Sequence, residues 1–539
     1  MGRWTAVSIL AAAQFVMVLD SSVMNVSISQ IVEDLDTSIQ GVQFAITAYT
    51  LVMAAFMLVG AKIGDIWGRE RAFAIGLAVY GVGSLTTALS PNLGVLLIGW
   101  SLIEGLGAVL VVPAIAALVA ANYEGKDRAL AYGIIGGIAA AAIAVGPVIG
   151  GWVTTAYTWR LVFVGEVVIV AVILVLRGRL RPSAKAARIP QLDVVGAALS
   201  AIGLALVVFG ILMSSTWGWI QPRVVPVVAG VELTPLGFSL VPFLILAGVG
   251  FLAAFASWQE RRQTRGQDGL VDLAMLRIET LRAALLTLGM QQLILLGTFF
   301  VLPVYLQVVL GLNAFETGLK LLPMSATMLV AALTGPRLAA RRSPKRVVQI
   351  GLVALSIAAV GLVATIDVEL GEIGFAIALA IFGIGVGLLA SQLGNVIMSS
   401  VAPDQTNEAG GLQGTAQNLG ASLGTALIGA ILLGALATGF VDQIAENPAL
   451  PDDVRNALTE IAETQGLDVL PVAQVESLLL GAGVAPDVAD AVATDYGTAQ
   501  LEALKIAIGA VAVFAFLGLW FTRRLPGEPL GSPEAATGP

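Results

Sequence analysis

The 539-residue chain contains no cysteine and no histidine. These absences exclude disulfide bonds, thiolate chemistry, histidine-ligated metals and a histidine proton relay. A serine–histidine–aspartate set cannot form, and the chain has no Gly-x-x-x-x-Gly-Lys-Ser/Thr loop for a nucleotide. We therefore expect no catalytic residue, no cofactor and no metal, and a protein that is not an enzyme.

Charged side chains are also scarce, at 12% of the chain, whereas 57% is hydrophobic and the mean hydropathy is +0.91. A soluble domain carries about 25% charged residues, and a helix needs about 20 apolar residues to cross a bilayer. The sequence predicts an all-α membrane protein. Its fourteen candidate spans lie near residues 6–32, 43–61, 72–90, 94–120, 130–153, 161–176, 193–213, 237–257, 283–310, 318–340, 347–366, 373–400, 410–440 and 501–522.

The basic residues predict the orientation of these spans, because cytoplasmic loops are enriched in Lys and Arg. A cytoplasmic N-terminus places 23 of the 28 basic residues inside. Both termini are then cytoplasmic, and the acid-rich segment 441–500 is outside, where we expect short amphipathic helices. Since the acidic residues gather in that segment, the net charge of −8 does not indicate nucleic-acid binding. The tail 526–539 is rich in proline and is predicted to be disordered.

One polar stretch joins the second and third apolar segments: Gly60, Gly64, Asp65, Gly68, Arg69 and Arg71. Gly60 and Gly64 lie on one helix face and would allow another helix to approach closely. This stretch resembles the Gly-x-x-x-Asp-x-x-Gly-Arg-x-Arg/Lys loop motif of the major facilitator superfamily of secondary transporters. The alternative is an ordinary positive-inside turn with packing glycines, which would leave Asp65 unexplained.

A second stretch carries Gly146, Pro147, Gly150 and Gly151 within the fifth span. Proline kinks a helix, and glycines beside it permit close contact with a neighbour. The stretch resembles the Gly-Pro-x-x-Gly-Gly antiporter motif of the exporters in the superfamily, with Ala142 in place of the upstream glycine. The alternative is a kinked, closely packed helix without a role in transport direction.

The first span carries Asp20 and Asn25 in a stretch that resembles the Leu-Asp-x-Thr-Val-x-Asn-Val motif of fourteen-span drug:proton antiporters. Asp20 lies about 21 Å along the helix from its cytoplasmic end, within the bilayer. A carboxylate there is costly, so it should be protonated, paired or facing water. Asp20 could instead be a structural acid satisfied by neighbouring hydroxyls.

The fourth span departs from the family motif Arg-x-x-Gln-Gly-x-Gly. Ser101 stands in place of the arginine and Glu104 in place of the glutamine, and Glu166 follows in the sixth span. Asp20, Glu104 and Glu166 are thus three acids within the membrane without an equally deep cation, a set that suits protons and cationic substrates. We predict that they couple transport to protons, although Glu166 could instead lie near the outer interface.

Neutral polar side chains are the remaining candidates for substrate binding. The predicted substrate cavity comprises Asn25, Gln291, Gln292, Gln392, Asn395, Gln413 and Gln417. Helix packing alone would explain the glycines that surround them.

The resemblance covers nearly the whole chain and implies a major facilitator fold of two six-helix bundles plus two extra central helices. The implied domains are an N-terminal bundle at residues 1–185, the linker and extra helices at 186–260, and a C-terminal bundle at 261–525. A weak internal repeat with a shift of 275 residues supports two related halves.

The resemblance also implies a multidrug exporter of the bacterial cytoplasmic membrane that exchanges small amphiphilic, cationic compounds for protons. Its partners would be the substrate, protons and the lipid bilayer, and the protein would act as a monomer. Two alternatives remain open: an exporter of a lipid, siderophore or metabolite with the same fold, and a membrane scaffold or sensor that transports nothing.

Overall fold

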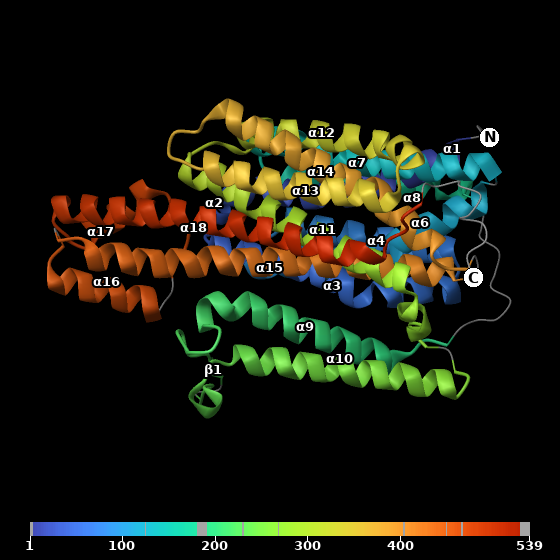
Figure 1. Ribbon diagram of the computed structural model, residues 1–539, viewed down its shortest axis with the longest axis horizontal. Helices are drawn as coiled ribbons and strands as arrows, with labels where there is room; N and C mark the ends of the chain where they lie inside the picture. The colour runs from blue at the N-terminus through green and yellow to red at the C-terminus, as the bar shows by residue number, and fades with distance from the viewer. Residues whose placement is uncertain are drawn as a thin grey trace.

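The computed structural model describes residues 4–123, 125–180, 191–228, 231–267, 269–402, 405–448, 450–464 and 467–528 (Figure 1). The first half contains α1 (Thr5–Val26), α2 (Ile28–Asp34), α3 (Ile39–Trp67), α4 (Arg69–Ala88), α5 (Leu93–Leu96), the π-helix η1 (Leu97–Glu104), α6 (Gly105–Asn122), α7 (Gly125–Ala156), α8 (Arg160–Leu176) and the short η2 (Arg177–Arg179). A hairpin of α9 (Val194–Trp217) and α10 (Val241–Thr264) follows, with a two-stranded ribbon (β1, Val227–Val228; β2, Val231–Glu232) and η3 (Pro235–Gly237) in its connection.

The second half begins at η4 (Leu273–Arg277). It contains α11 (Glu279–Val304), η5 (Tyr305–Val309), α12 (Ala314–Arg341), α13 (Pro344–Thr365), α14 (Glu372–Ser399), α15 (Thr406–Glu446), α16 (Asp452–Thr464), α17 (Val472–Gly481), α18 (Pro486–Phe521) and η6 (Thr522–Arg524). Both described chain ends lie at one end of the molecule, which we call the terminal end. Helices α16 and α17 project at the opposite end, which we call the loop end (Figure 1).

The prediction of an all-α membrane protein is confirmed. Twelve helices of the described chain are long and apolar enough to cross a bilayer, and a bent pair, Ile134–Ile143 with Val145–Ala156, would make a thirteenth. The predicted span 72–90 corresponds to α4, a 20-residue helix that is not among the twelve. Fourteen spans therefore remain a prediction.

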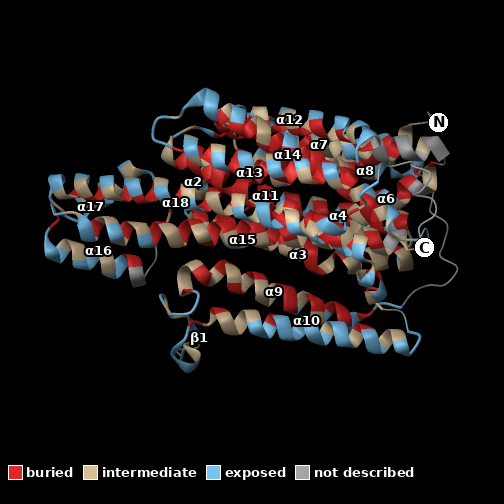
Figure 2. Cartoon of the chain, viewed as in Figure 1, coloured by how far each residue is buried: buried red, intermediate tan, exposed pale blue. Residues whose placement is uncertain are grey.

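The two halves meet along two seams. At one seam α7 packs against α12, and at the other α3 packs against α15. Within the halves, α1 lies on α7, α4 on α6 and α8, and α11 on α15 and α18. The buried residues follow these contacts through the centre of the molecule (Figure 2).

The extra pair α9–α10 is central in the sequence but lateral in space. Helix α9 packs on both α3 and α15, and α10 packs on α9 (Figure 1). Val208 and Leu212 of α9 are buried with Ala426 of α15, and the ring of Phe209 meets Phe44 of α3 edge-on with centroids 6.4 Å apart. Helix α10 is largely uncovered on its outer side (Figure 2).

The acid-rich segment forms two short helices, α16 and α17, as predicted. The flanking helices are longer than the predicted spans 410–440 and 501–522, because α15 continues to Glu446 and α18 already begins at Pro486. These long apolar helices carry α16 and α17 away from the bundle (Figure 1). The predicted disordered tail lies from residue 529 onward outside the described residues, and so do residues 181–190, which include the start of the predicted linker.

Candidate functional site

The three predicted membrane acids come together in space. Asp20 lies on α1, Glu104 closes the π-helix η1, and Glu166 lies on α8, and one carboxylate oxygen of each is within 4.8 Å of the other two. None is more than 1% exposed. We call this cluster the carboxyl triad. The side chain of Glu166 is buried beside the other two acids, and its depth in the membrane stays a prediction.

Aromatic and hydroxyl side chains hold two of these acids. The indole N–H of Trp100 donates to both oxygens of Asp20, at 2.8 and 3.0 Å, and the Trp100 ring stacks on Tyr49 with centroids 4.7 Å apart. Tyr80 and Ser84 donate to one oxygen of Glu166, at 3.2 and 3.0 Å. The sequence analysis missed these donors, although a tyrosine and a serine four residues apart share one helix face.

Glu104 is held differently, because neither of its carboxylate oxygens has a hydrogen-bond partner. Ser101, which stands where relatives carry arginine, donates instead to the carbonyl of Ala45. None of the ion pairs that we find among the described residues involves a member of the triad. A buried charge without a partner costs several kcal/mol, roughly, so a proton or a bound cation must neutralise part of this cluster.

Glycines bring the helices of the triad close together. A Cβ on Gly83 of α4 would lie 2.5 Å from the backbone nitrogen of Glu104, and a Cβ on Gly107 would lie 2.5 Å from that of Tyr80. The backbone at residues 97–104 is wound as a π-helix, a conformation found often at functional sites. Helical periodicity in the sequence does not reveal such a segment.

The loop motif between α3 and α4 has the close helix approach predicted at Gly60 and a turn at Gly68. A Cβ on Gly60 would lie 2.2 Å from the carbonyl of Val109, so α6 does approach closely there. Gly68 has a φ of 91°, which a glycine adopts without strain and which turns the chain. At Gly64 a Cβ would meet the side chain of Arg69, the first residue of α4, at 3.0 Å.

The charges of this motif pair within it. The guanidinium of Arg69 forms an ion pair with Asp65 and donates to the carbonyl of Ala61 at 3.3 Å, while Arg71 is exposed. Nearby, Lys62 lies 3.9 Å from Glu408 of α15, so an ion pair crosses between the halves at the terminal end.

The proline-containing motif of α7 shows the predicted kink and close packing. The helix bends by 45° between Ile143 and Val145, where Pro147 lacks the N–H that would bond to the carbonyl of Ile143. A Cβ on Gly146 would lie 2.5 Å from that of Ser22, and a Cβ on Gly150 would lie 2.6 Å from Val23. The motif therefore packs on α1 beside Asp20.

Gly151 of the same motif faces the other half of the molecule. A Cβ on it would lie 2.3 Å from the carbonyl oxygen of Ala314 in α12. The same close approach occurs from the other side, since a Cβ on Gly318 of α12 would lie 2.3 Å from the carbonyl oxygen of Pro147. The two backbones thus touch across the seam.

The predicted cavity residues come from α1, α11, α14 and α15. Asn25 is buried and donates to the carbonyl of Ser21 at 2.7 Å. Gln392 is buried and donates to Ser391, whereas Asn395 is exposed and Gln417 is half-buried. Side-chain oxygens without a partner occur on Asn25, Gln291, Gln292 and Gln413. Their role in substrate binding stays a prediction.

Comparisons with known proteins agree with this architecture. The probable actinorhodin transporter of Streptomyces coelicolor is 28% identical over 561 residues, covering 98% of this chain and 92% of that protein. The tetracenomycin C resistance and export protein of Streptomyces glaucescens is 27% identical, covering 82% of this chain and 78% of that protein. Both are named as transporters or exporters.

Among solved structures, a bacterial homologue of the human lysosomal transporter Spinster, in an inward-facing and unoccupied conformation, has a similar fold. Its TM-score is 0.59 at 14% identity, with 96% of this chain and 97% of that chain covered. The family model of the Major Facilitator Superfamily matches residues 10–225 and 221–425. With its two helical halves and this match over most of its length, the chain belongs to the Major Facilitator Superfamily of membrane transporters.

Proposed function

We propose that this protein exports small amphiphilic, cationic compounds in exchange for protons, and that the carboxyl triad couples the two movements. The observation that carries the proposal is the burial of Asp20, Glu104 and Glu166 within 4.8 Å of one another. Relatives named for antibiotic export and resistance support a drug-like substrate.

Coupling follows from the charge of the triad. A proton on one acid lowers the negative charge of the cluster, and a cationic substrate does the same, so the two compete for one site. The unpartnered oxygens of Glu104 and Glu166 are the groups free to exchange a proton. Mutually exclusive binding of two ligands is sufficient for antiport when each is carried by the same conformational change.

The orientation and the conformational state belong to the same proposal. The basic residues favour a cytoplasmic terminal end. At the loop end, Gln307 donates to the carbonyl of Val26 at 2.8 Å and accepts from the backbone N–H of Ser29 at 3.2 Å, joining the halves. With the contact of Gly151 and Gly318, these bonds close the outer side. Such a closure is what an inward-facing state requires, and the gate at Asp65 then works at the cytoplasmic end.

A second candidate is export of a neutral or anionic metabolite by the same route. Two relatives are each named for a single compound, actinorhodin or tetracenomycin C, which supports export of one metabolite rather than of a range of drugs. Uptake into everted vesicles of cationic and uncharged dyes, under the same imposed pH gradient, separates the two candidates. Transport of uncharged dyes alone would favour the second.

The test of coupling is proton release from the purified full-length protein. Addition of ethidium, a cationic amphiphile, to the native protein in weak buffer should release protons. The triple variant Asp20→Asn, Glu104→Gln, Glu166→Gln should release none. Glu372→Gln removes an exposed acid of α14 that pairs with Lys320 and serves as the control. Equal release from the triple variant and the native protein would place coupling elsewhere.

A further inference from the structure

The chain between α9 and α10, which we call the ribbon connection (residues 218–240), is tied to its own root. The backbone N–H of Val224 donates to the carbonyl of Thr216 at 3.2 Å, and the backbone N–H of Ser239 donates to the carbonyl of Ile220 at 2.9 Å. Together with the antiparallel pair β1 and β2, these bonds give the ribbon connection a fixed shape.

The ribbon connection extends sideways from the helix pair. The segment around β1 lies at the loop end of α10, on the side that faces away from the bundle (Figure 1). Helices α16 and α17, at the same end of the molecule, instead continue along its long axis (Figure 1). The ribbon connection therefore overhangs the membrane beside the protein.

The length of the helix pair places the ribbon connection at the edge of the hydrocarbon. Near the terminal end, Asp193 before α9 accepts from Trp258 at 2.9 Å and from Gln259 at 2.6 Å, so a polar cluster marks one boundary. A hydrocarbon core about 30 Å thick corresponds to about 20 helical residues. Counting about 20 residues from Trp258 toward the loop end reaches Phe238, and the same count from Asp193 along α9 reaches Met213. Both chains thus leave the hydrocarbon close to the ribbon connection.

Large apolar side chains of the ribbon connection are exposed, and charged ones are scarce. Its sequence contains only two charged residues, Arg223 and Glu232. The exposed apolar side chains are those of Trp219, Ile220, Val227, Leu236 and Phe238. They continue the exposed outer side of α10, a helix long and apolar enough to cross a bilayer (Figure 2). An exposed apolar patch of this kind indicates a membrane contact, and tryptophan is enriched at the interface between lipid and water.

Leu236 is the most exposed of these side chains, at 86%, and its backbone lies in the left-handed region with a φ of 56°. Residues other than glycine rarely adopt that region, because their Cβ approaches the following carbonyl oxygen. Packing within the protein does not explain a strained leucine whose side chain projects from the surface. Insertion of the side chain into lipid does explain it, because the removal of apolar surface from water is favourable.

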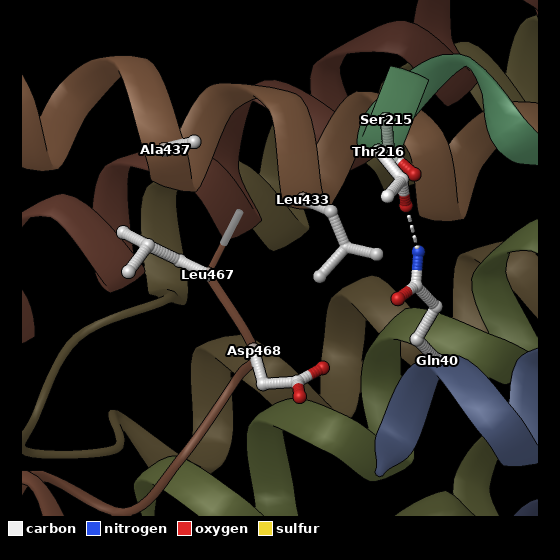
Figure 3. A pocket seen from close by; sticks show the side chains of 7 residues that line it. All are labelled: Gln40, Ser215, Thr216, Leu433, Ala437, Leu467 and Asp468. Carbon is white, nitrogen blue, oxygen red and sulfur yellow. Dashed lines mark hydrogen bonds between the residues drawn. The ribbon is translucent and has the colours of Figure 1, made fainter. Parts of the chain in front are cut away.

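The root of the ribbon connection is joined to the rest of the molecule. Gln40 of α3 donates to the hydroxyl of Thr216 at 2.6 Å, beside a small pocket that Leu433 of α15 also lines (Figure 3). Helix α9 itself packs on α3 of the first half and on α15 of the second. A lipid contact made by the ribbon connection therefore holds α9 where the two halves meet.

We propose that the ribbon connection lies on the bilayer leaflet at the loop end, with the side chains of Trp219, Leu236 and Phe238 at the boundary between headgroups and acyl chains. Its partner is the lipid surface itself. Because the exposed side chains are apolar and the charges are few, the contact requires no particular headgroup. It fastens α9–α10 to the membrane from the side. This inference concerns how the protein is held in the bilayer, and it does not depend on which compound is transported.

Spin labels at two exposed leucines test the lipid contact. The chain has no cysteine, so Leu236→Cys in the ribbon connection and Leu478→Cys on α17 each supply the only thiol for a nitroxide. In phosphatidylcholine vesicles, the ratio of collision rates with oxygen and with a water-soluble nickel chelate should be at least about threefold higher at Leu236→Cys, because oxygen concentrates in lipid and the chelate does not enter it. An equal ratio at the two positions would overturn the proposal. Low access of both reagents to Leu236→Cys would also overturn it, because a protein partner would then cover this surface.

A polar substitution tests whether Leu236 itself enters the lipid. Leu236→Asn keeps the backbone conformation, since asparagine adopts a positive φ more readily than leucine, and it removes the apolar side chain. A nitroxide on Ile220→Cys should then collide with the nickel chelate about threefold more often, whereas Leu478→Asn should leave that label unchanged. If Leu236→Asn leaves the label on Ile220→Cys unchanged as well, the leucine is not inserted and the proposal is wrong. Neither measurement uses a transported compound, so the result holds even if the proposed export of ethidium fails.

Discussion

Asp20 and Trp100 are joined by a single indole N–H, which lies 2.8 Å from one carboxylate oxygen and 3.0 Å from the other. The stacked ring of Tyr49 fixes the plane of the indole. A hydrogen bond to a charged group contributes about 1.5–3 kcal/mol. The indole of Trp100 therefore stabilises the ionised form of Asp20.

Trp100→Phe should keep the stack on Tyr49 and remove that donor. The expected result is ethidium transport slowed by about tenfold or more, because ionised Asp20 loses its stabilising bond. Trp159→Phe is the control, since it removes an indole bond of 2.9 Å to Asp34, which keeps its ion pair with Arg160. The measurement is the rate of ethidium transport by each variant in proteoliposomes. Equal rates for the two variants would show that the bond to Asp20 has no role in transport.

Gly318→Ala should damage the seam at the loop end. The added methyl would lie 2.3 Å from the carbonyl oxygen of Pro147, and overpacking of this kind costs about 1–3 kcal/mol. We expect slower transport with a shift away from the closed outer side, measured by labelling of a cysteine placed at Thr155. Gly165→Ala on α8 has open space around its Cβ and should transport normally. Normal labelling and normal transport by Gly318→Ala would contradict this prediction.

Much of this arrangement could be predicted from the sequence, for physical reasons. Long apolar runs identified the helices, and the expense of a buried carboxylate identified Asp20, Glu104 and Glu166. The pattern could not show that these acids meet, because that depends on the π-helix at 97–104 and on the close approach at Gly83. The sequence pattern also could not predict the lateral position of α9, because a helix that is apolar on all sides does not show which face packs against a neighbour.

Asp65→Asn should weaken the gate at the terminal end. The substitution leaves the buried guanidinium of Arg69 without its ion-pair partner, a loss on the order of 1–3 kcal/mol that shifts conformational populations several-fold. Transport of ethidium should fall while expression stays normal. Glu70→Gln, in the same turn of the chain but outside this pair, is the control. If Asp65→Asn transports ethidium at the native rate with the native pH dependence, Asp65 does not act as a gate.

Asp468→Asn tests a half-buried carboxyl that lines a small pocket with Gln40, Thr216 and Leu433 at the loop end (Figure 3). Burial raises the pKa of the Asp468 carboxyl above its usual 3.8. Because the pKa is higher in the folded protein than in the unfolded chain, folding disfavours the charged carboxylate. The free energy of unfolding is therefore unaffected by this group below about pH 4, and it decreases as the pH rises through the folded-state pKa. Asp468→Asn should therefore raise the unfolding temperature at about pH 7 and change it little at about pH 4. A drop at pH 7 would mean that the charge itself is needed there.

Ser477→Cys tests the orientation on which the cytoplasmic and outer assignments depend. Ser477 is exposed on α17, and the native chain offers no other thiol. A membrane-impermeant maleimide should label this variant in intact cells, because the distribution of basic residues places the loop end outside. Thr264→Cys, exposed at the end of α10 near the opposite end, should react only after the cells are permeabilised. If Ser477→Cys behaves like Thr264→Cys, the loop end is cytoplasmic, the outer closure through Gln307 becomes an inner one, and the direction of transport proposed above must be reversed.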